Sequence, residues 1–339
     1  MNNQADWKPE HYGIDPVAFQ DELAAEGIVG GPSRKLGKSV RDLMQQKFLP
    51  LKWAVEGIIP EGLTVIAGKP KLGKSWMMLG IAFDVAAGKP TMGDRRTEQG
   101  EVLYLALEDG DRRIQDRVSK IMKGIDVPEG FYYETLCPRL DCGGRESIEE
   151  WIENSPKPRM IIVDTLAMVK PIGKSNTNAY ASDYAAINHL KRLADKHGIS
   201  IVVVTHTRKS AADDVFDTVT GTTGITGAAD TNLVLDRPRA KVDAILSITG
   251  RDVEEQELAM SFDKESWRWS IVGNMDQIAM PQSEQEIIRA MRSAGEPMKP
   301  AQVAALINKD RKATGTYMQR MTEKGHLRGL GNGFYEVAV

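Results

Sequence analysis

The sequence predicts an α/β protein, in which a mostly parallel sheet with flanking helices is followed by a small C-terminal winged-helix domain. Apolar, β-branched runs of strand length alternate with helix-like runs from about residue 50 to 273. This alternation is typical of a parallel sheet covered by helices. A glycine-rich loop stands between the first such run and a long apolar helix. After residue 282 the order changes to three helix-like runs and two short strands, which indicates a second domain.

The composition limits the possible classes of protein. A length of 339 residues is enough for one large α/β domain and one small one. The net charge is −3, so any nucleic-acid binding must come from local basic surface. Two cysteines, Cys137 and Cys142, are too few for a disulfide framework or a zinc site and suit a reducing cytosol. The N-terminus lacks signal-peptide features, and no apolar run reaches the roughly 18 residues of a membrane span, so we expect a cytoplasmic protein.

The chain divides into four predicted segments. Residues 1–47 are a polar arm or linker with one short helix at 16–26, residues 48–274 are the main α/β domain, 275–282 are a linker, and 283–339 are the winged-helix domain. The strand candidates of the main domain are 63–67, 102–107, 160–164, 199–205, 231–236, 244–249, 257–262 and 267–271. Because only short turns separate the last three, we expect an antiparallel tail on the parallel sheet.

The glycine-rich loop fits the pattern G-x-x-x-x-G-K-[ST], which wraps nucleotide phosphates. Its residues are Gly68, Lys69, Pro70, Lys71, Leu72, Gly73, Lys74 and Ser75. Its glycines allow successive N–H groups to point into one concavity that suits an anion. The helix predicted at 76–87 adds its positive dipole end. We expect Lys74 to reach the β- and γ-phosphates and Ser75 to bind Mg²⁺; a glycine-rich turn without a ligand is the alternative.

Two further apolar strands end in carboxylates. Asp164 closes the strand at 160–164, where it can hold the water shell of Mg²⁺ beside the phosphate loop. Glu108 follows the strand at 102–107 and is our candidate for the carboxylate that polarises the attacking water in ATP hydrolysis. Its neighbour Asp109 is the competing candidate for this role. The alternatives are a strand-end cap for Asp164 and a solvated strand end for Glu108.

Two later strands end in residues that suit a γ-phosphate. His206 follows the strand at 199–205 and is the candidate sensor of that phosphate, with a structural histidine as the alternative. Arg251 follows the strand at 244–249 and is the candidate finger for a neighbouring subunit's nucleotide, with a surface arginine as the alternative. Three other cations compete for this role: Arg237, Arg239 and Lys241. The long polar loop at 207–227 carries Arg208 and Lys209, which can contact a phosphate backbone.

The C-terminal domain has recognisable helix ends and a hairpin. Ser283 is predicted as the N-cap of a helix at 283–293 with Glu286 completing a capping box, and further helices are expected at 300–308 and 312–324. Gly325 is expected to end the third helix in the C′ position. Strands at 326–330 and 334–338 meet at the glycine-rich turn 331–333, a hairpin signal.

The charge of this domain leaves two functions open. Residues 281–339 hold nine Lys and Arg against six Asp and Glu, so the region is mildly basic. One face of the third helix is predicted to carry Lys312, Thr314, Thr316, Arg320 and Lys324, as a reader of a DNA groove requires. Winged helices also dock proteins, so both DNA contact and protein docking remain possible.

These elements in this order resemble the RecA-like ATPase core, and more narrowly the plasmid RepA-type hexameric helicase group of plasmids and phages. The segments that carry the resemblance are PLKWAVEGIIPEG at 50–62, YLALED at 104–109, VVTHTRK at 203–209 and GRD at 250–252. The resemblance covers roughly residues 48–272. It implies ATP and Mg²⁺ as cofactors, Glu108 as catalytic base, Asp164 as metal residue, His206 as sensor and Arg251 as finger.

The resemblance also implies a homo-oligomeric ring, with a hexamer favoured, in which ATP binds at subunit interfaces and Arg251 acts in trans. The expected function is that of an ATP-driven DNA helicase or translocase in plasmid- or phage-type replication, with single-stranded DNA in the ring. The alternative is an ATP-dependent loader or recombination mediator that binds single-stranded DNA without translocating. A DNA-binding regulator that uses ATP to set its oligomeric state is a third possibility.

Overall fold

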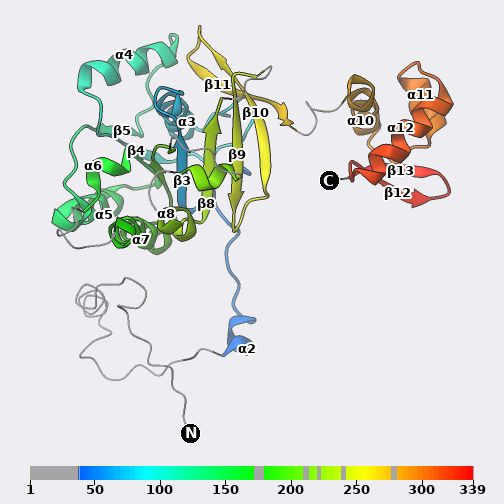
Figure 1. The fold of residues 1–339 in the computed structure, drawn as a ribbon. Helices are drawn as coiled ribbons and strands as arrows, with labels where there is room; N and C mark the ends of the chain where they lie inside the picture. Colours follow the sequence, from blue (N-terminus) through cyan, green and yellow to red (C-terminus); the bar gives the residue numbers. More distant parts are fainter. Residues whose placement is uncertain are drawn as a thin grey trace. The chain divides into compact units, whose positions relative to one another are not determined.

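The computed structural model describes residues 37, 39–171, 179–208, 214–219, 223–237, 242–275 and 281–338. The helix expected at 16–26 lies outside these residues, as do Lys209, Arg239, Lys241 and most of the expected linker. Two compact units make up the chain: Met1–Gln256 with Met260–Ile271, and Glu257–Ala259 with Val272–Val339 (Figure 1). Within the described ranges, no helix has the length and apolar character needed to cross a membrane.

The first unit is built on a nine-stranded sheet with the order β11-β10-β9-β8-β3-β7-β6-β4-β5 (Figure 1). The strands from β8 to β5 pair in parallel, and β9 pairs antiparallel to β8. The strands are β3 (Gly62–Gly68), β4 (Glu101–Ala106), β5 (Phe131–Glu134), β6 (Pro158–Asp164), β7 (Ser200–Val204), β8 (Thr231–Asp236), β9 (Ala244–Gly250), β10 (Gln256–Asp263) and β11 (Arg268–Asn274).

Helices cover both faces of this sheet, because its central strands are apolar on both sides. One face carries the long helix after the phosphate loop, α3 (Lys74–Ala87), whose packing partners include β3, β4 and β6. The other face packs on α5 (Arg145–Asn154) and α7 (Ala179–His197) in a cluster that includes Val65, Leu105 and Val163. The remaining helices of this unit are α2 (Val40–Leu43), α4 (Asp111–Met122), η2 (Leu140–Gly144), α6 (Leu166–Val169), η3 (Val215–Thr218) and α8 (Thr223–Ala228).

The mostly parallel sheet with flanking helices confirms this part of the predicted fold class. All of the expected strands are present, with ends that differ by a few residues. The helix after the loop begins at Lys74, two residues earlier than predicted. The segment expected as a long loop at 207–227 contains η3 and most of α8, so the expectation of a loop was wrong for these described residues. The prediction missed β5 and a short hairpin formed by β1 (Trp53–Val55) and β2 (Ile59–Pro60).

The second unit contains three helices and a two-stranded antiparallel sheet. They are α10 (Gln282–Ala294), α11 (Pro300–Leu306), α12 (Arg311–Glu323), β12 (Leu327–Gly331) and β13 (Phe334–Val337). Its core gathers Ile287, Met291, Val303, Met318 and Leu327. This order agrees with a winged helix, although the assignment to that class and the predicted domain boundaries stay predictions.

Two details of the second unit correct the sequence analysis, and a third agrees with it. Ser283 does not cap α10, because the helix starts at Gln282 and its N-cap is Pro281, which offers no side-chain hydrogen bond. Thr314 cannot face a DNA groove, because its side chain is buried and its hydroxyl donates to the carbonyl of Asp310 at 2.8 Å. Gly325 directly follows the C-cap residue of α12 and has a φ of 80°, as the predicted C′ glycine requires.

Candidate nucleotide site

The register of the sheet brings the predicted site residues to one edge. Ala106 of β4 pairs with Asp164 of β6, Asp164 pairs with Val204 of β7, and Val204 pairs with Ile66 of β3. Because these strands are parallel, the segments that follow them emerge on the same side of the sheet. The phosphate loop, Glu108, Asp164 and His206 therefore gather at this edge, although they come from four separate parts of the chain.

The phosphate loop connects the end of β3 to the first turn of α3. Lys71 and Gly73 have φ angles of 63° and 103°, which turn the backbone in the way an anion-binding concavity requires. The side chain of Lys74 folds back over the loop, and its ammonium group donates to the carbonyl of Gly68 at 2.6 Å and that of Lys69 at 3.1 Å. A cation is thus held above the loop amides, where a phosphate chain can bind.

Burial determines the electrostatics of this lysine. Lys74 is only 5% exposed. Desolvation by burial lowers the pKa of Lys74 to about 8, and the nearby carboxylates of Asp164 and Glu108 oppose this change. The ammonium group therefore lies close enough to both acids to feel their charge. The two carboxylates and the lysine therefore lie close together at the sheet edge.

Asp164 is buried at the end of β6 beside two hydroxyl groups. The phenol of Tyr104, on the neighbouring strand β4, donates to Asp164 Oδ2 at 2.7 Å. The hydroxyl of Ser75, from the phosphate loop, lies close enough to this carboxylate to lower its pKa. Burial raises the pKa of Asp164, while these two hydroxyl groups oppose the increase. Ser75 and Asp164, the two residues predicted for Mg²⁺, are thus direct neighbours and offer the oxygen donors that this ion prefers.

The structure separates the two neighbouring acids after β4. The carboxylate of Asp109 is bound by two guanidinium groups of α4, those of Arg113 at 2.8 Å and Arg117, and its side chain is 10% exposed. Glu108 is exposed, and its Oε1 accepts a hydrogen bond from Thr165 Oγ1 at 3.0 Å. Glu108 therefore has the open carboxylate that a catalytic base needs, whereas Asp109 is engaged in ion pairs.

His206 lies beside the phosphate-loop lysine. Its Nδ1 is 3.3 Å from Lys74 Nζ, and the ring is half-buried. The adjacent residue Thr205 continues the strand direction of β7 and donates its N–H to the carbonyl of Ile66 on β3 at 2.9 Å. A contact across strand ends thus holds the imidazole next to the group expected to bind the γ-phosphate.

Arg251 lies at the opposite end of the sheet from this site. Gly250 pairs with Thr231 of β8, and Thr231 pairs with Thr64 near the start of β3. The four residue steps from Thr64 to Gly68 span about 13 Å. Arg251 Nη1 donates to Asp230 Oδ1 at 3.0 Å, and the side chain is 58% exposed. Arg251 therefore cannot reach the phosphate loop of its own chain.

The other predicted cations that the structure describes have contacts or exposure of their own. Arg237 follows β8 and donates to the carbonyl of Asp243 at 3.3 Å. Arg208 is exposed, and its N–H donates to the carbonyl of Thr218 at 2.6 Å. Lys312 and Arg320 are exposed on α12 of the second unit.

Three residues that contact the site residues were missed by sequence reasoning. Tyr104 holds Asp164, Thr165 holds Glu108, and Trp269 of β11 contacts Gly73 of the phosphate loop. Tyr104 occupies an ordinary position in an apolar run, and Trp269 is far from the loop in sequence. Thr165, which directly follows the predicted acid Asp164, is the one that a closer reading of the strand end could have suggested.

Comparison with known proteins agrees with this site. The family described as AAA domain matches residues 32–212, which is more than half of the chain. The chain belongs to the AAA domain family. The matched segment of this AAA protein includes the phosphate loop, Glu108, Asp164 and His206. No curated protein matches the sequence significantly.

Solved structures show which fold this AAA protein has. A structure described as an ATPase domain matches with a TM-score of 0.50 and 12% identity, covering 78% of this chain and 99% of the other. A structure of a DnaB-like replicative helicase, described with its interactions with primase, matches with a TM-score of 0.53 and 13% identity, covering 77% and 73%. The chain thus has the RecA-like fold of replicative-helicase ATPase domains.

Proposed function

We propose that this protein is an ATP-hydrolysing, ring-forming DNA helicase or translocase of plasmid- or phage-type replication. The observation that carries the proposal is the convergence of Lys74, Ser75, Asp164, Glu108 and His206 at one sheet edge. This set provides a phosphate cradle, an oxygen-ligand pair and an open carboxylate, which together are the parts of a phosphoryl-transfer site. The fold shared with replicative-helicase ATPase domains supports the choice of DNA as the polymer.

In the proposed reaction, the loop amides and the ammonium group of Lys74 bind the β- and γ-phosphates of ATP. Ser75 and Asp164 would hold Mg²⁺, which neutralises phosphate charge when bound. Glu108 accepts a proton from the attacking water, while the hydroxyl of Thr165 keeps its carboxylate oriented. Because His206 contacts Lys74, loss of the γ-phosphate changes the charge next to the imidazole. His206 can therefore report hydrolysis to the loop that begins with the next residue.

DNA binding is proposed at two places. Arg208 and Lys209 lie in the loop after His206, so a strand bound there would respond to hydrolysis. In the second unit, the exposed cations Lys312 and Arg320 lie eight positions apart on α12, which places them on a similar side of the helix. We propose that this unit is a winged helix and that α12 contacts duplex DNA.

A non-translocating loader or recombination mediator is the second candidate. The open carboxylate of Glu108 favours a hydrolysing enzyme over a passive binder, but such a mediator also hydrolyses ATP. The two candidates differ in what they do to a fork. A helicase displaces a strand from forked DNA in an ATP-dependent manner, whereas a mediator shows DNA-stimulated ATPase activity without displacement.

The proposed site is tested with Glu108→Gln, which keeps the side-chain shape but cannot accept the proton. We expect ATP affinity to stay within about threefold and turnover to fall about 10²- to 10⁴-fold. Asp109→Asn is the matched control, because it changes the adjacent acid that is bound to arginines, and its turnover should stay within several-fold of the parent. ATP binding by titration calorimetry and single-turnover hydrolysis measure both quantities. Normal turnover in Glu108→Gln would move the base elsewhere.

Lys74→Ala completes this test as the variant without a phosphate-binding cation. It should lose ATP binding and every ATP-dependent activity, including displacement of a labelled strand from forked DNA. ATPase activity that is stimulated by single-stranded DNA but gives no displacement in the unmodified protein would favour the mediator over the helicase.

A further inference from the structure

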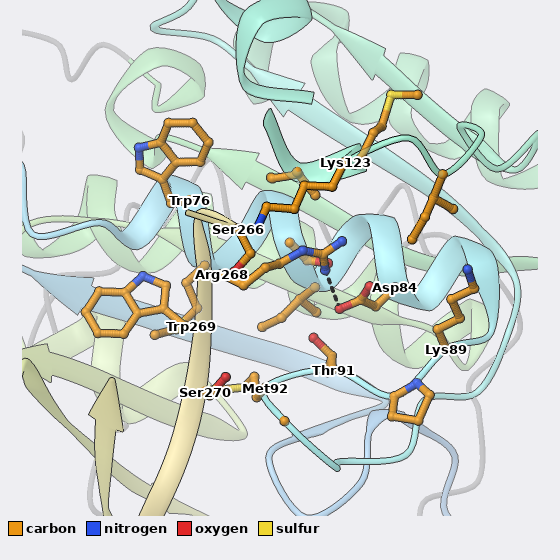
Figure 2. A pocket seen from close by; sticks show the side chains of 18 residues that line it. Trp76, Asp84, Lys89, Thr91, Met92, Lys123, Ser266, Arg268, Trp269 and Ser270 are labelled. Atoms are coloured by element: carbon orange, nitrogen blue, oxygen red, sulfur yellow. Dashed lines mark hydrogen bonds and ion pairs between the residues drawn. The ribbon is translucent and has the colours of Figure 1, made fainter. Parts of the chain in front are cut away.

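Two adjacent residues of β11, Arg268 and Trp269, form hydrogen bonds with α3 and with the residue before it. Trp269 Nε1 donates to the carbonyl of Gly73 at 3.2 Å, at the start of the helix. Arg268 Nη1 donates to Asp84 Oδ2 at 2.7 Å and to the carbonyl of Gly80 at 3.3 Å, further along the helix. Figure 2 shows Arg268 extending along α3 to Asp84, with Trp269 toward the other end of the helix. We refer to Arg268 and Trp269 as the β11 clamp.

The clamp contacts the residue that shapes the phosphate loop. Gly73 has a φ of 103°, and a Cβ atom added there would lie 3.0 Å from Cζ2 of the Trp269 ring. The indole therefore packs directly against the glycine. The Gly73 carbonyl also accepts the N–H of Met77 at 3.0 Å, as the first hydrogen bond of α3. The helix and the indole together determine where this carbonyl points.

The direction of the Gly73 carbonyl sets the direction of a phosphate-binding amide. The carbonyl of Gly73 and the N–H of Lys74 belong to one planar trans peptide unit, so they point in opposite directions. Holding the carbonyl on the outer side, toward Trp269, therefore keeps the N–H of Lys74 turned into the loop. An amide that is oriented before the ligand arrives does not have to be ordered during binding, and this increases affinity.

A cavity of about 320 Å³ adjoins the clamp, and its lining includes Trp76, Met77, Ile81, Ile121 and Met92. Side-chain contacts hold the clamp beside this cavity. Asp84 is buried, which raises its pKa, while the nearby Thr91 opposes this increase. Trp269 lies against Phe262 with the ring centroids 5.1 Å apart. These contacts fix Arg268 and Trp269 relative to the helix.

We infer that Trp269 is a positioning residue for the phosphate loop, and that the Arg268–Asp84 pair keeps it in place. This inference rests on the proposed function, because it assigns Trp269 a part in ATP binding. Trp269 acts through the peptide between Gly73 and Lys74. Since the clamp makes no contact with Glu108 or Asp164, it affects the capture of ATP and leaves the chemical step unchanged.

The test is Trp269→Phe, which keeps an aromatic ring but removes the N–H donor. We expect ATP affinity to fall about twofold to tenfold, the range for loss of one hydrogen bond, while kcat stays within about twofold. Trp151→Phe is the matched control, because this tryptophan lies on α5 and packs on the cluster at the other sheet face. Its ATP affinity should be unchanged. Titration calorimetry gives the affinity and steady-state kinetics separates KM from kcat.

A second measurement uses the unaltered side chain. In protein labelled with 5-fluorotryptophan, the Trp269 resonance, assigned by its absence in Trp269→Phe, should shift when ATP binds and should not shift in Lys74→Ala. Arg268→Lys should give a smaller affinity loss in the same direction. If Trp269→Phe binds ATP as the parent does, or if the Trp269 resonance of the parent does not shift when ATP binds, the inference fails and the proposed function stands. If the parent itself binds no ATP, the proposed function fails first and the inference with it.

Discussion

At the scale of single residues, burial of Lys74 makes the charge of this phosphate-binding cation sensitive to pH. Its ammonium group is almost fully buried and makes two hydrogen bonds to loop carbonyls. Burial lowers the pKa of Lys74 from 10.5 to about 8, because the neutral form is easier to desolvate. A phosphate chain bound at the loop would favour the charged form and would raise this pKa again.

ATP affinity should therefore decrease as pH rises above about 8. Below this pH the free protein already carries the proton on Lys74, so binding needs no proton uptake. Above it the free protein has lost that proton and must regain it on binding, so affinity falls by up to about tenfold per pH unit. Titration calorimetry in two buffers with different ionisation enthalpies measures the proton uptake directly.

The control for this experiment is to measure whether the free protein stays folded over the same pH range. The lowered pKa makes Lys74 neutral in the folded chain while it stays protonated in the unfolded chain between about pH 8 and 10.5. This one group thus increases folding stability with rising pH in that window. A loss of affinity caused by unfolding would appear in circular dichroism. Constant affinity and no proton uptake between about pH 7 and 9.5 would contradict the role of Lys74.

At the scale of elements, the predictable parts are those where local pattern and tertiary position agree. The buried strands β3, β4, β6 and β7 are continuous apolar runs, so their ends and the acids that follow them could be located in the sequence. The edge strand β5 has the sequence FYYE, and most of its side chains are exposed, so it lacks the apolar run that would predict a buried strand. Ser283 has a typical N-cap sequence but lies inside α10, because Pro281 takes the cap position.

Long-range contacts explain most of what the sequence did not reveal about the site. Tyr104 belongs to an apolar strand, and only the pairing of β4 with β6 places its hydroxyl on Asp164. Trp269 reaches Gly73 because β11 crosses α3, and no local pattern encodes that crossing. The sequence also could not decide between Glu108 and Asp109 as the catalytic base. The structure decides between them, because two arginines of α4 form ion pairs with Asp109.

The helix α12 provides a prediction at this scale, because its cations differ in their contacts. Arg320 is exposed, whereas Lys324 Nζ forms an ion pair at 3.1 Å with Glu284, whose side chain is only 4% exposed. Arg320→Ala should weaken binding of duplex DNA several-fold and reduce the slope of log K against log salt concentration by about 0.9. Its melting temperature should be unchanged.

Lys324→Ala is the matched variant, and it should have the opposite profile. Removing the lysine leaves the buried carboxylate of Glu284 without this partner, so the melting temperature should fall by several degrees. Fluorescence anisotropy over a salt series and thermal melts measure the two effects. If Arg320→Ala and Lys312→Ala both bind duplex DNA as the parent does, protein docking becomes the better proposal for this unit.

At the scale of the whole molecule, the predicted role of Arg251 depends on the proposed assembly of subunits. It lies at the end of the sheet that is remote from the phosphate loop of its own chain, so it can act on a nucleotide only in another subunit. Head-to-tail contacts that repeat with a fixed rotation close into a ring, and each interface then pairs one loop with the next subunit's arginine. The proposed ring would thus form a complete site only between subunits.

Arg251→Ala should bind ATP normally but hydrolyse it about 10³-fold more slowly. The fold should tolerate the change, because Asp230 keeps its hydrogen bonds with Lys191 Nζ at 2.8 Å and with the N–H of Leu63 at 2.9 Å. Rings that contain Arg251→Ala and Lys74→Ala subunits in equal amounts should recover activity. An intact loop then faces an intact arginine at about one quarter of randomly formed interfaces.

The matched control is a mixture of Glu108→Gln and Lys74→Ala subunits. Both variants are defective on the loop side of the interface, so no arrangement of them creates a complete site, and the activity should stay at the level of the separate variants. ATP hydrolysis by co-purified mixed rings measures both cases. Recovery to about a quarter of the parent activity in the first mixture alone would place Arg251 in trans, because only that mixture combines complementary halves. Equal, low activity in both mixtures would exclude a role in trans. Parent-like turnover in Arg251→Ala alone would remove Arg251 from the reaction and leave its pairing with Asp230 as its role.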